Sequence, residues 1–300
     1  MDKLRAMETF VRIVDGGSLT AAANSLRTSL PSVVRSLAAL EDSLGVRLLN
    51  RTTRRLALTD EGREYYERSK RVLSEVDDAQ SAMSARRRTP RGRLRVTAPV
   101  MFGRMHLAPL VTDFVLKHAA LQVDLLFLDR VVDLVEEGID VGVRIGQLPD
   151  SSLVAIPVGQ TRRLTCASPA YLKRAGTPRS LADLAAHRCV SSTGLAQGNE
   201  WAFAADARPI HVAVNNALIS NQIDAALDAC LCGVGLGQFL CYQAQAALAE
   251  GRLRRVLREH EPAPLPIHVI YPHARLLSSN VRTFVDWTVP KLRAKRLGAT

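Results

Sequence analysis

Residues 18–45 read SLTAAANSLRTSLPSVVRSLAALEDSLG, and this stretch decides the fold of the N-terminal part of the chain. Ser18 and Ser29 each provide a hydroxyl group that can cap the N-terminus of a helix. Small residues follow Ser18, which suits a short, tightly packed helix. After Ser29, apolar residues recur at helical spacing until Gly45 ends the run, namely Val33, Leu37, Leu40 and Leu44. The pattern predicts two helices joined by a turn.

The second of these helices has the two faces expected of a DNA recognition helix. Its apolar stripe must pack on the first helix, which leaves residues near its N-terminal end for base edges and phosphates. Behind it, a basic segment lies between the apolar stretches Leu48-Leu49 and Leu56-Ala57-Leu58, which predicts a two-stranded wing with a positively charged tip. The candidate DNA-binding residues are Ser29, Leu30, Pro31, Ser32, Arg35 and Ser36 in the helix and Arg51, Thr53 and Arg54 in the wing.

A helix, a turn and a second helix also occur in many proteins that never bind nucleic acid, and arginine runs are often only solvated surface. The residues from Leu4 to Gly62 favour DNA binding, because they resemble, without a gap, the DNA-binding domain of LysR-type transcriptional regulators. The resemblance is carried by Met7, Phe10, Val14, Gly17, Ser18, Ala22, Ala23, Leu26, Ser29, Pro31, Val33, Arg35, Leu40, Glu41, Leu44, Gly45, Leu48, Arg51, Arg54, Leu58, Thr59 and Gly62.

Three residues of the presumed recognition helix depart from the family pattern. Leu30 stands where the family often has Gln, Val34 where it often has Ser, and Ala38 where it has a longer polar or basic residue. Fewer polar side chains predict fewer hydrogen bonds to base edges and more reliance on thymine methyl groups or DNA shape.

The composition fits a globular protein with an anionic partner. The chain has 300 residues, 47% of them hydrophobic, and a formal net charge of +11. This charge suits nucleic acid, and a membrane surface would satisfy it as well. The acidic residues Asp2, Glu8 and Asp15 argue against a signal peptide, and no apolar run approaches membrane-spanning length. We therefore expect a cytoplasmic protein with no membrane partner.

Five cysteines lie in apolar surroundings, and we expect reduced, mostly buried thiols: Cys166, Cys189, Cys230, Cys232 and Cys241. The segment from Cys230 to Cys232, with Cys241, would otherwise suit a soft metal or a redox pair. No metal-ligand spacing recurs, however, and no His stands close in the sequence. We expect no cofactor and no metal.

A long helix should follow the wing, from Asp60 to about Ala85, with Thr59 as its cap and an apolar stripe along it. Packing against its own chain is one explanation of the stripe. The resemblance implies another, namely the linker helix through which LysR-type subunits pair antiparallel. Pro90 and Gly92, within the basic run from Arg86 to Arg93, then predict a hinge.

From Leu94 onward, strands and helices alternate, which predicts a doubly wound parallel sheet. A second such run begins near Arg163, and the last elements should return to the first sheet. In the first run, Val131 to Glu137 reads as a helix. The resemblance implies a two-lobed α/β effector domain built like periplasmic binding proteins. The expected domains are 1–59 (mainly α, winged helix-turn-helix), 60–88 (linker) and 89–300 (effector), with lobe I at 93–162 and 268–300 and lobe II at 163–267.

Ligands of open α/β sheets bind beyond the carboxyl ends of the strands. The expected strand exits give the candidate effector-binding residues Pro99, Val100, Met101, Phe102, Asp129, Arg144, Thr193 and Asn216. Arg144 suits a ligand carboxylate, with help from backbone amides after Pro99. A structural ion pair explains Arg144 equally well, and ordinary packing explains Met101 and Phe102. The set suggests a small organic acid.

No motif points to catalysis. The chain has no Walker-type loop, no Gly-x-Ser-x-Gly elbow and no paired-His helix. The glycine run from Gly233 to Gly237 continues with Gln238 and follows a predicted helix, so we interpret it as a buried strand with close backbone packing and not as a dinucleotide fingerprint.

The sequence thus predicts a DNA-binding regulator that is not an enzyme. The resemblance implies as partners double-stranded DNA, a small-molecule effector that modulates operator binding or promoter activation, further copies of the chain as a dimer of dimers, and RNA polymerase. The alternative is a cytosolic small-molecule-binding protein that does not recognise a DNA sequence.

Overall fold

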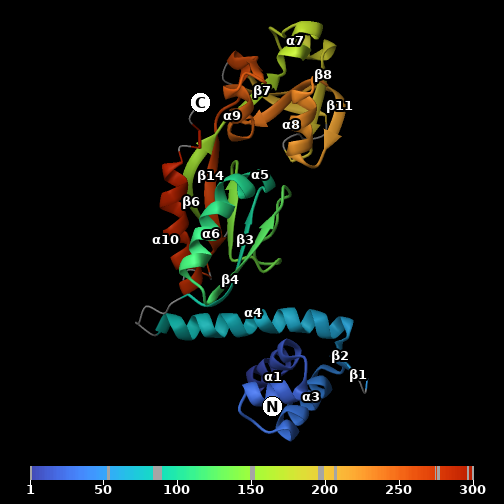
Figure 1. Cartoon of the computed structure of the whole chain (residues 1–300), viewed down its shortest axis with the longest axis vertical. Helices are drawn as coiled ribbons and strands as arrows, with labels where there is room; N and C mark the ends of the chain where they lie inside the picture. The colour runs from blue at the N-terminus through green and yellow to red at the C-terminus, as the bar shows by residue number, and fades with distance from the viewer. Residues whose placement is uncertain are drawn as a thin grey trace. The chain divides into compact units, whose positions relative to one another are not determined.

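The computed structural model describes residues 2–52, 55–83, 90–148, 153–194, 199–205, 208–273, 275, 278–295 and 297–298. These residues fall into two compact units, one holding the elements α1 to α4 and the other the elements from β3 onward (Figure 1).

The first unit is a three-helix head followed by a wing and a long helix. Its elements are α1 (Lys3–Gly16), α2 (Leu19–Ser25), α3 (Leu30–Leu44), β1 (Leu49–Thr52), β2 (Arg55–Leu58) and α4 (Asp60–Met83). The predicted caps are confirmed, since the Ser18 hydroxyl accepts a hydrogen bond from the Ala21 amide at 3.0 Å and the Thr59 hydroxyl accepts one from the Gly62 amide at 2.8 Å. Both caps satisfy amides that a helix N-terminus leaves without a partner.

The core of the head is apolar and closed. Its fully buried side chains come from all three helices and the start of the wing, and include Phe10, Ile13, Leu37, Leu40 and Leu48. The first turns of α4 close this core, because the Phe10 ring packs against the rings of Tyr65 and Tyr66 at centroid distances of 5.8 and 6.5 Å. The Tyr66 hydroxyl also donates a hydrogen bond to Asp15 on α1.

The second unit contains two five-stranded sheets, which define two lobes. The sheet of lobe I has the order β4-β3-β5-β14-β6, and that of lobe II the order β11-β8-β12-β7-β13. Lobe I is made of β3 (Gly92–Ala98), α5 (Val100–Phe102), a π-helical segment (Gly103–Leu107), α6 (Ala108–Lys117), β4 (Leu121–Phe127), β5 (Val141–Ile145), β6 (Leu153–Thr161), β14 (Leu265–Pro272) and α10 (Ser279–Ala294).

Lobe II is made of β7 (Arg163–Ala167), α7 (Pro169–Ala175), β8 (Arg188–Ser192), β9 (Glu200–Ala205), β10 (Arg208–Ala213), β11 (Asn215–Ser220), α8 (Ile223–Leu231), β12 (Leu236–Leu240), α9 (Cys241–Ala249) and β13 (Arg254–Val256), with 3-10 turns at Ala182–Ala186 and Arg258–His260. The helix α9 and the hairpin of β9 and β10 were not predicted. β10 pairs with β9 in a two-stranded sheet that is separate from the main sheet of lobe II.

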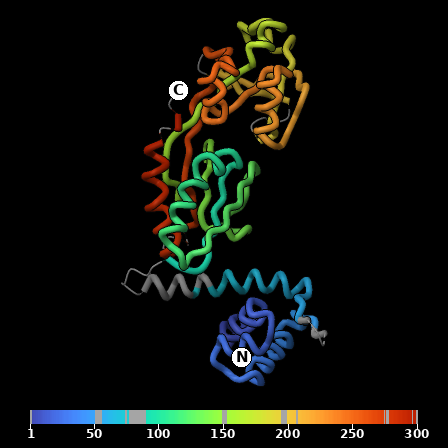
Figure 2. Tube along the Cα trace, in the orientation of Figure 1, coloured from blue at the N-terminus to red at the C-terminus, as the bar shows by residue number. Residues whose placement is uncertain are grey.

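The expectation of purely parallel sheets is wrong. In lobe I, β4, β3 and β5 are parallel, whereas β14 runs antiparallel to both β5 and β6. The reason is that β6 leaves lobe I for lobe II and β14 returns, so the two crossing strands lie side by side in opposite directions (Figure 2). In lobe II, β12 likewise pairs parallel with β8 and antiparallel with β7.

The helix predicted from Val131 to Glu137 is absent. Val131 and Val135 are 89% and 63% exposed, so their spacing does not mark a core-facing stripe. The Asp133 carboxylate instead accepts hydrogen bonds from the amides of Val135 and Glu136 at 2.8 and 3.0 Å. A side chain that binds nearby backbone amides favours a turn over a helix.

The interpretation of the glycine run is partly confirmed. The buried strand begins only at Leu236, after a turn. A Cβ atom at Gly235 would lie 2.3 Å from the Arg188 carbonyl oxygen, and one at Gly237 would lie 2.4 Å from the Phe239 ring. Glycine is therefore needed here for close packing.

Candidate DNA-binding and effector sites

The recognition helix α3 is positioned from its buried side. Val33, Leu37 and Leu40 are 1 to 2% exposed and anchor the helix in the head. Ser29 caps the N-terminus, where its hydroxyl accepts a hydrogen bond from the Ser32 amide at 3.4 Å, and Pro31 occupies the first turn. The first two turns of α3 therefore have a fixed orientation in the head.

The candidate residues of α3 do not all lie on one surface. Leu30, Pro31 and Arg35 are exposed, with Leu30 at 42%. Ser32 and Ser36 are half-buried and line a hollow of about 310 Å³, together with Arg5, Glu8, Thr9, Ser25, Leu26, Arg27, Thr28 and Val33. The two serines thus lie on the flank of α3 that faces α1, and the exposed residues lie on the outer side.

The predicted wing is present. β1 and β2 pair antiparallel with Leu49 opposite Leu58 and Thr52 opposite Arg55. The backbone of Arg51 belongs to β1, whereas Thr53 and Arg54 lie outside the described residues.

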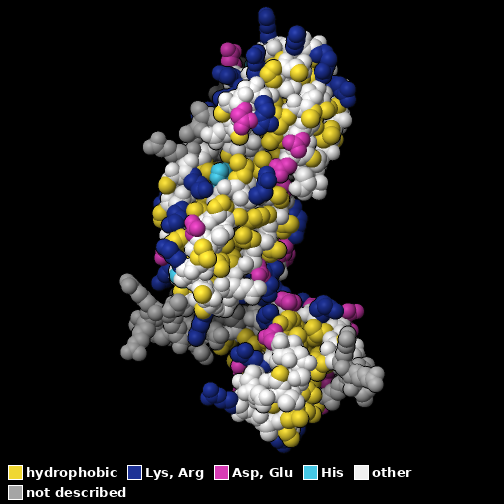
Figure 3. Space-filling view, in the orientation of Figure 1, with side chains coloured by type: hydrophobic (Ala, Val, Ile, Leu, Met, Phe, Trp, Pro, Cys, Tyr) yellow, Lys and Arg dark blue, Asp and Glu magenta, His cyan; other side chains and the backbone are white. Residues whose placement is uncertain are grey.

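The positive charge of the chain is not confined to the head. Lys and Arg side chains are scattered over the face of the second unit that Figure 3 shows, with Asp and Glu side chains among them. Net charge alone therefore does not locate the DNA-binding surface. The positions of α3 and the wing identify it instead.

The attachment of the wing depends on two residues whose role the sequence reasoning did not identify. The Glu41 carboxylate on α3 accepts hydrogen bonds from the first amides of the wing, and a Cβ atom at Gly62 would lie 2.0 Å from the Leu48 carbonyl oxygen. Glu41 and Gly62 were matched only as part of the family pattern. An acidic residue four positions before a helix-ending glycine is too common a signal to have revealed this contact.

In lobe I, the end of β4 meets the start of α5. The Asp129 carboxylate accepts a hydrogen bond from the Val100 amide at 3.0 Å through Oδ1. Its other oxygen, Oδ2, is buried and has no hydrogen-bond partner within the described part of the chain. Burial raises the pKa of Asp129, and the negative charge of Asp224 adds to the shift, against the hydrogen bond from Val100.

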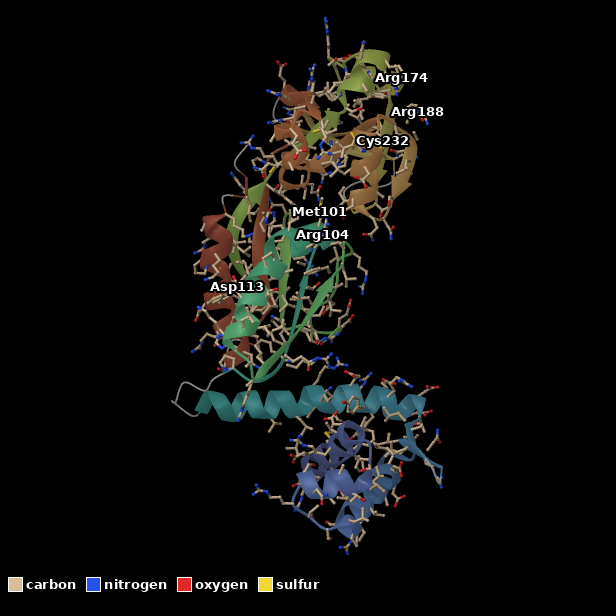
Figure 4. All side chains as sticks on the ribbon, in the orientation of Figure 1. Met101, Arg104, Asp113, Arg174, Arg188 and Cys232 are labelled. Carbon is tan, nitrogen blue, oxygen red and sulfur yellow. The ribbon has the colours of Figure 1, made fainter. Side chains whose placement is uncertain are left out.

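Asp129 faces lobe II. A Cβ atom at Gly194 of lobe II would lie 3.3 Å from the Asp129 Cβ atom. Close by, Arg104 of lobe I forms an ion pair with Asp224 of lobe II at 3.1 Å. In Figure 4, Arg104 and Met101 lie at the end of lobe I that is nearest to lobe II. These residues therefore form the junction between the lobes, with two carboxylates and one guanidinium group.

Aromatic side chains form the interior of this junction. Met101 and Phe102 are 6% and 0% exposed, which agrees with ordinary packing. Phe102 packs against Tyr242 of α9, and His106 of the π-helical segment packs against both rings at centroid distances of 5.0 and 5.3 Å. Burial, and to a lesser extent Lys295, lowers the pKa of His106 to about 4, so this imidazole is neutral at pH 7.

His106 and Tyr242 were missed as junction residues. The helix that carries Tyr242 was not predicted, and the π-helical register that turns His106 inward has no sequence signal. Such single π-turns are frequent at functional sites.

The described residues show no structural ion pair for Arg144, and its contact with a ligand carboxylate stays a prediction. Its guanidinium group donates hydrogen bonds to the carbonyl oxygens of Val132 and Val143 at 3.2 and 3.4 Å. No carboxylate within the described residues forms an ion pair with this guanidinium group. The negative charge of the more distant Glu137 favours its charged form. Burial lowers the pKa of Arg144, which still leaves the group fully charged.

The two candidates in lobe II lie at opposite ends of the sheet. The Thr193 amide donates to the Ser220 carbonyl oxygen at 2.9 Å, at the carboxyl ends of β8 and β11. Asn216 follows the strand β10, but β10 lies outside the main sheet, and Asn216 is at the amino end of β11, which runs parallel to β8. The Asn216 carboxamide instead accepts a hydrogen bond from Ser191 at 2.5 Å.

All five cysteines are free, and every one except Cys232 is buried, as predicted. Burial raises the pKa of Cys166 and Cys189 to about 12, which keeps them as thiols. In the part of the chain that the structure describes, no group of His, Cys, Asp and Glu could hold a metal ion, and no helix is long and apolar enough to cross a membrane.

Models of known protein families match parts of both units. The model of the LysR substrate binding domain matches residues 87–293, and that of the bacterial regulatory helix-turn-helix protein, lysR family, matches residues 4–63. A helix-turn-helix-type transcriptional repressor of Pseudomonas aeruginosa is 36% identical over 291 residues, which are 96% of this chain and 92% of that protein.

Solved structures agree with this assignment. CrgA, a LysR-type regulator from Neisseria meningitidis, is 32% identical with a TM-score of 0.62, and the virulence activator AphB from Vibrio cholerae is 26% identical with a TM-score of 0.62. Each alignment covers 96% of this chain and 98% of the other. The chain therefore belongs to the LysR family of bacterial transcriptional regulators, which bind DNA through the N-terminal domain and small-molecule effectors through the C-terminal domain.

Proposed function

We propose that this regulator binds duplex DNA as a dimer of dimers, with the outer side of α3 in the major groove and the wing on the adjacent phosphate backbone. The observation that carries this proposal is the exposure of Leu30, Pro31 and Arg35 on the first two turns of α3, beside a wing that Glu41 holds in place. A helix whose N-terminal turns are exposed next to a basic strand pair fits the docking of a winged helix on DNA.

Pairing through α4 is the proposed basis of the dimer. At 24 residues, α4 is about 36 Å long. Its first turns carry Tyr65 and Tyr66, which pack on the head of the same chain. Farther along, Val72 is 38% exposed and Leu73 and Val76 are half-exposed, so the later part of the stripe remains for a second copy of α4. We also propose that the regulator, when bound at a promoter, contacts RNA polymerase.

The proposed effector site is the junction between the lobes. A ligand there changes DNA binding only if it favours one arrangement of the lobes over another. The organic acid suggested by the sequence fits this junction poorly, because Arg144 is engaged by backbone carbonyl groups and Asp129 already occupies the amide of Val100. The unpartnered Oδ2 of Asp129 instead suits an effector that donates a hydrogen bond.

The test is a titration of the purified protein against duplex DNA from upstream of its own gene and against scrambled duplex, across a salt series. We expect tighter binding to the upstream duplex, with an affinity that falls steeply as salt rises. Arg35→Ala should weaken this binding, whereas Arg179→Ala, a variant at an exposed position of lobe II, should not. If wild-type protein binds neither duplex at low salt, the proposal fails.

A further inference from the structure

Three apolar residues form a stripe along one flank of α3. Leu30, Val34 and Ala38 follow one another at intervals of four residues, and residues at this spacing lie above one another on a helix. Leu30 is 42% exposed and the other two are half-buried. Ala38 lines a hollow with Val46, Arg47 and Leu49, at the start of the wing. The stripe is therefore on the flank of α3 that faces the wing.

The polar residues of the same two turns lie elsewhere. Ser32 and Ser36 face the hollow beside α1, together with Arg5 and Glu8. Between the two flanks, the outer side of α3 presents Pro31 and Arg35. Among residues 30–38, Arg35 is thus the one charged side chain, and the three residues of the stripe offer no side-chain hydrogen bond. Glu41 and Asp42, which also line the hollow beside the wing, lie farther along α3.

This distribution limits how the helix can read bases. In the major groove, hydrogen-bonding side chains distinguish guanine, adenine and cytosine, whereas an apolar side chain distinguishes thymine through its 5-methyl group. Leu30 lies on the first turn of α3, and base contacts of recognition helices come mainly from their N-terminal residues. The chemistry of this flank therefore matches a thymine methyl group and no other base feature.

We propose that Leu30, supported by Val34, is a specificity-determining residue that contacts the 5-methyl group of a thymine in each half-site of the operator. This inference rests on the proposed function, because it requires α3 to lie in the major groove. Burying one methyl group contributes roughly 0.8 kcal/mol, which corresponds to about a fourfold change in affinity.

The first experiment selects binding sites from a library of randomised duplexes, so the operator sequence need not be given in advance. Wild-type protein, Leu30→Gln and the control Leu4→Gln are each used for the selection. Leu4 is 43% exposed, as Leu30 is at 42%, but lies on α1 outside the recognition helix. We expect the wild type and the control to enrich the same thymine in each half-site, and Leu30→Gln to lose or replace the preference at that one position.

The second experiment removes only the methyl group. The enriched duplex is resynthesised with 2′-deoxyuridine in place of the assigned thymine of one half-site, which leaves the hydrogen-bonding edge of the base unchanged. Wild-type affinity should fall about fourfold, and the affinity of Leu30→Ala should be equal for both duplexes.

The outcomes distinguish an error in the methyl contact from an error in the proposed function. If the wild type enriches a sequence but tolerates uracil at every thymine, the helix binds DNA and the methyl contact is wrong. If Leu30→Ala is as sensitive to uracil as the wild type, another residue makes the contact and the assignment to Leu30 is overturned. If the wild type enriches no sequence at all, the proposed function itself fails.

Discussion

The carboxylate of Glu41 accepts a hydrogen bond from the backbone amide of Leu48 at 2.8 Å, seven residues further along the chain. The same oxygen accepts a second hydrogen bond from the Leu49 amide at 3.2 Å. The recognition helix is thereby joined to the first strand of the wing by a charged acceptor, and such hydrogen bonds are stronger than neutral ones. The two elements that are proposed to contact DNA therefore share one attachment.

Glu41→Ala should weaken DNA binding without altering the second unit. The change leaves two backbone amides without their acceptor, which costs about 1–3 kcal/mol in the head. We expect a lower unfolding temperature of the head by circular dichroism and a weaker affinity for duplex DNA. Glu41→Gln keeps an acceptor oxygen and should retain most of the thermal stability and most of the DNA affinity. Equal losses in the two variants would show that the negative charge matters more than the hydrogen bonds.

Gly62→Ala should destabilise the same attachment from the other side. The added methyl group would lie 2.0 Å from the Leu48 carbonyl oxygen, and backbone atoms cannot yield as a flexible side chain can. Overpacking of this kind costs about 1–3 kcal/mol. The measurement is the thermal unfolding of the head, with Arg63→Ala, an exposed neighbour, as the matched control. A stability equal to that of the control would mean that the first turn of α4 can shift away from the wing.

The N-terminal unit could be predicted closely because its signals are local. Capping hydroxyls, helix-ending glycines and apolar spacing at Ser18, Ser29 and Gly45 act within a few residues, and each lies at a helix end in the structure. The wing followed from the same local reasoning. What these signals could not show was which flank of α3 faces α1, and so Ser32 and Ser36 were grouped with the exposed residues.

The effector domain could be predicted only in outline, because its details depend on long-range pairing. The direction of β14 is set by its return from lobe II, more than 100 residues after β5. Asn216 was expected to follow a strand of the main sheet, but the strand before it, β10, pairs with β9 in a separate sheet, and Asn216 lies at the start of β11. The junction between the lobes brings Phe102 next to Tyr242, and no local pattern connects residues so far apart in the sequence.

Asp129→Asn should raise the stability of the second unit at neutral pH. The pKa of Asp129 is raised above the unfolded value of about 3.9, so the folded state favours the protonated form. The associated stability is fully present below about pH 3.9 and is lost as pH rises through the raised pKa. Asparagine can still accept the hydrogen bond from Val100 but carries no buried charge.

Tryptophan fluorescence measures this effect selectively, because both tryptophans of the chain, Trp201 and Trp287, belong to the second unit. The unfolding temperature of Asp129→Asn should exceed that of the wild type at pH 7, and the difference should narrow toward pH 4. Asp113→Asn, at an exposed position of α6, should follow the wild type throughout. A less stable Asp129→Asn at every pH would mean that the carboxylate makes a contact the unit needs.

Substitution of His106 should change the pH dependence of the same unit in the opposite direction. The pKa of His106 falls from its ordinary value of 6.5 to about 4 in the folded state, because burial disfavours the charged imidazole. For a group with a depressed pKa, the stability is fully present above pH 6.5 and is lost as pH falls toward 4. Protonation of His106 should therefore lower the unfolding temperature of the wild type at pH 5 relative to pH 7. His106→Phe retains an aromatic ring between Phe102 and Tyr242 but cannot bind a proton. The decrease in unfolding temperature from pH 7 to pH 5 should therefore be smaller for this variant than for the wild type. If the variant loses as much stability as the wild type, other groups cause the acid sensitivity and His106 is not the residue that senses it.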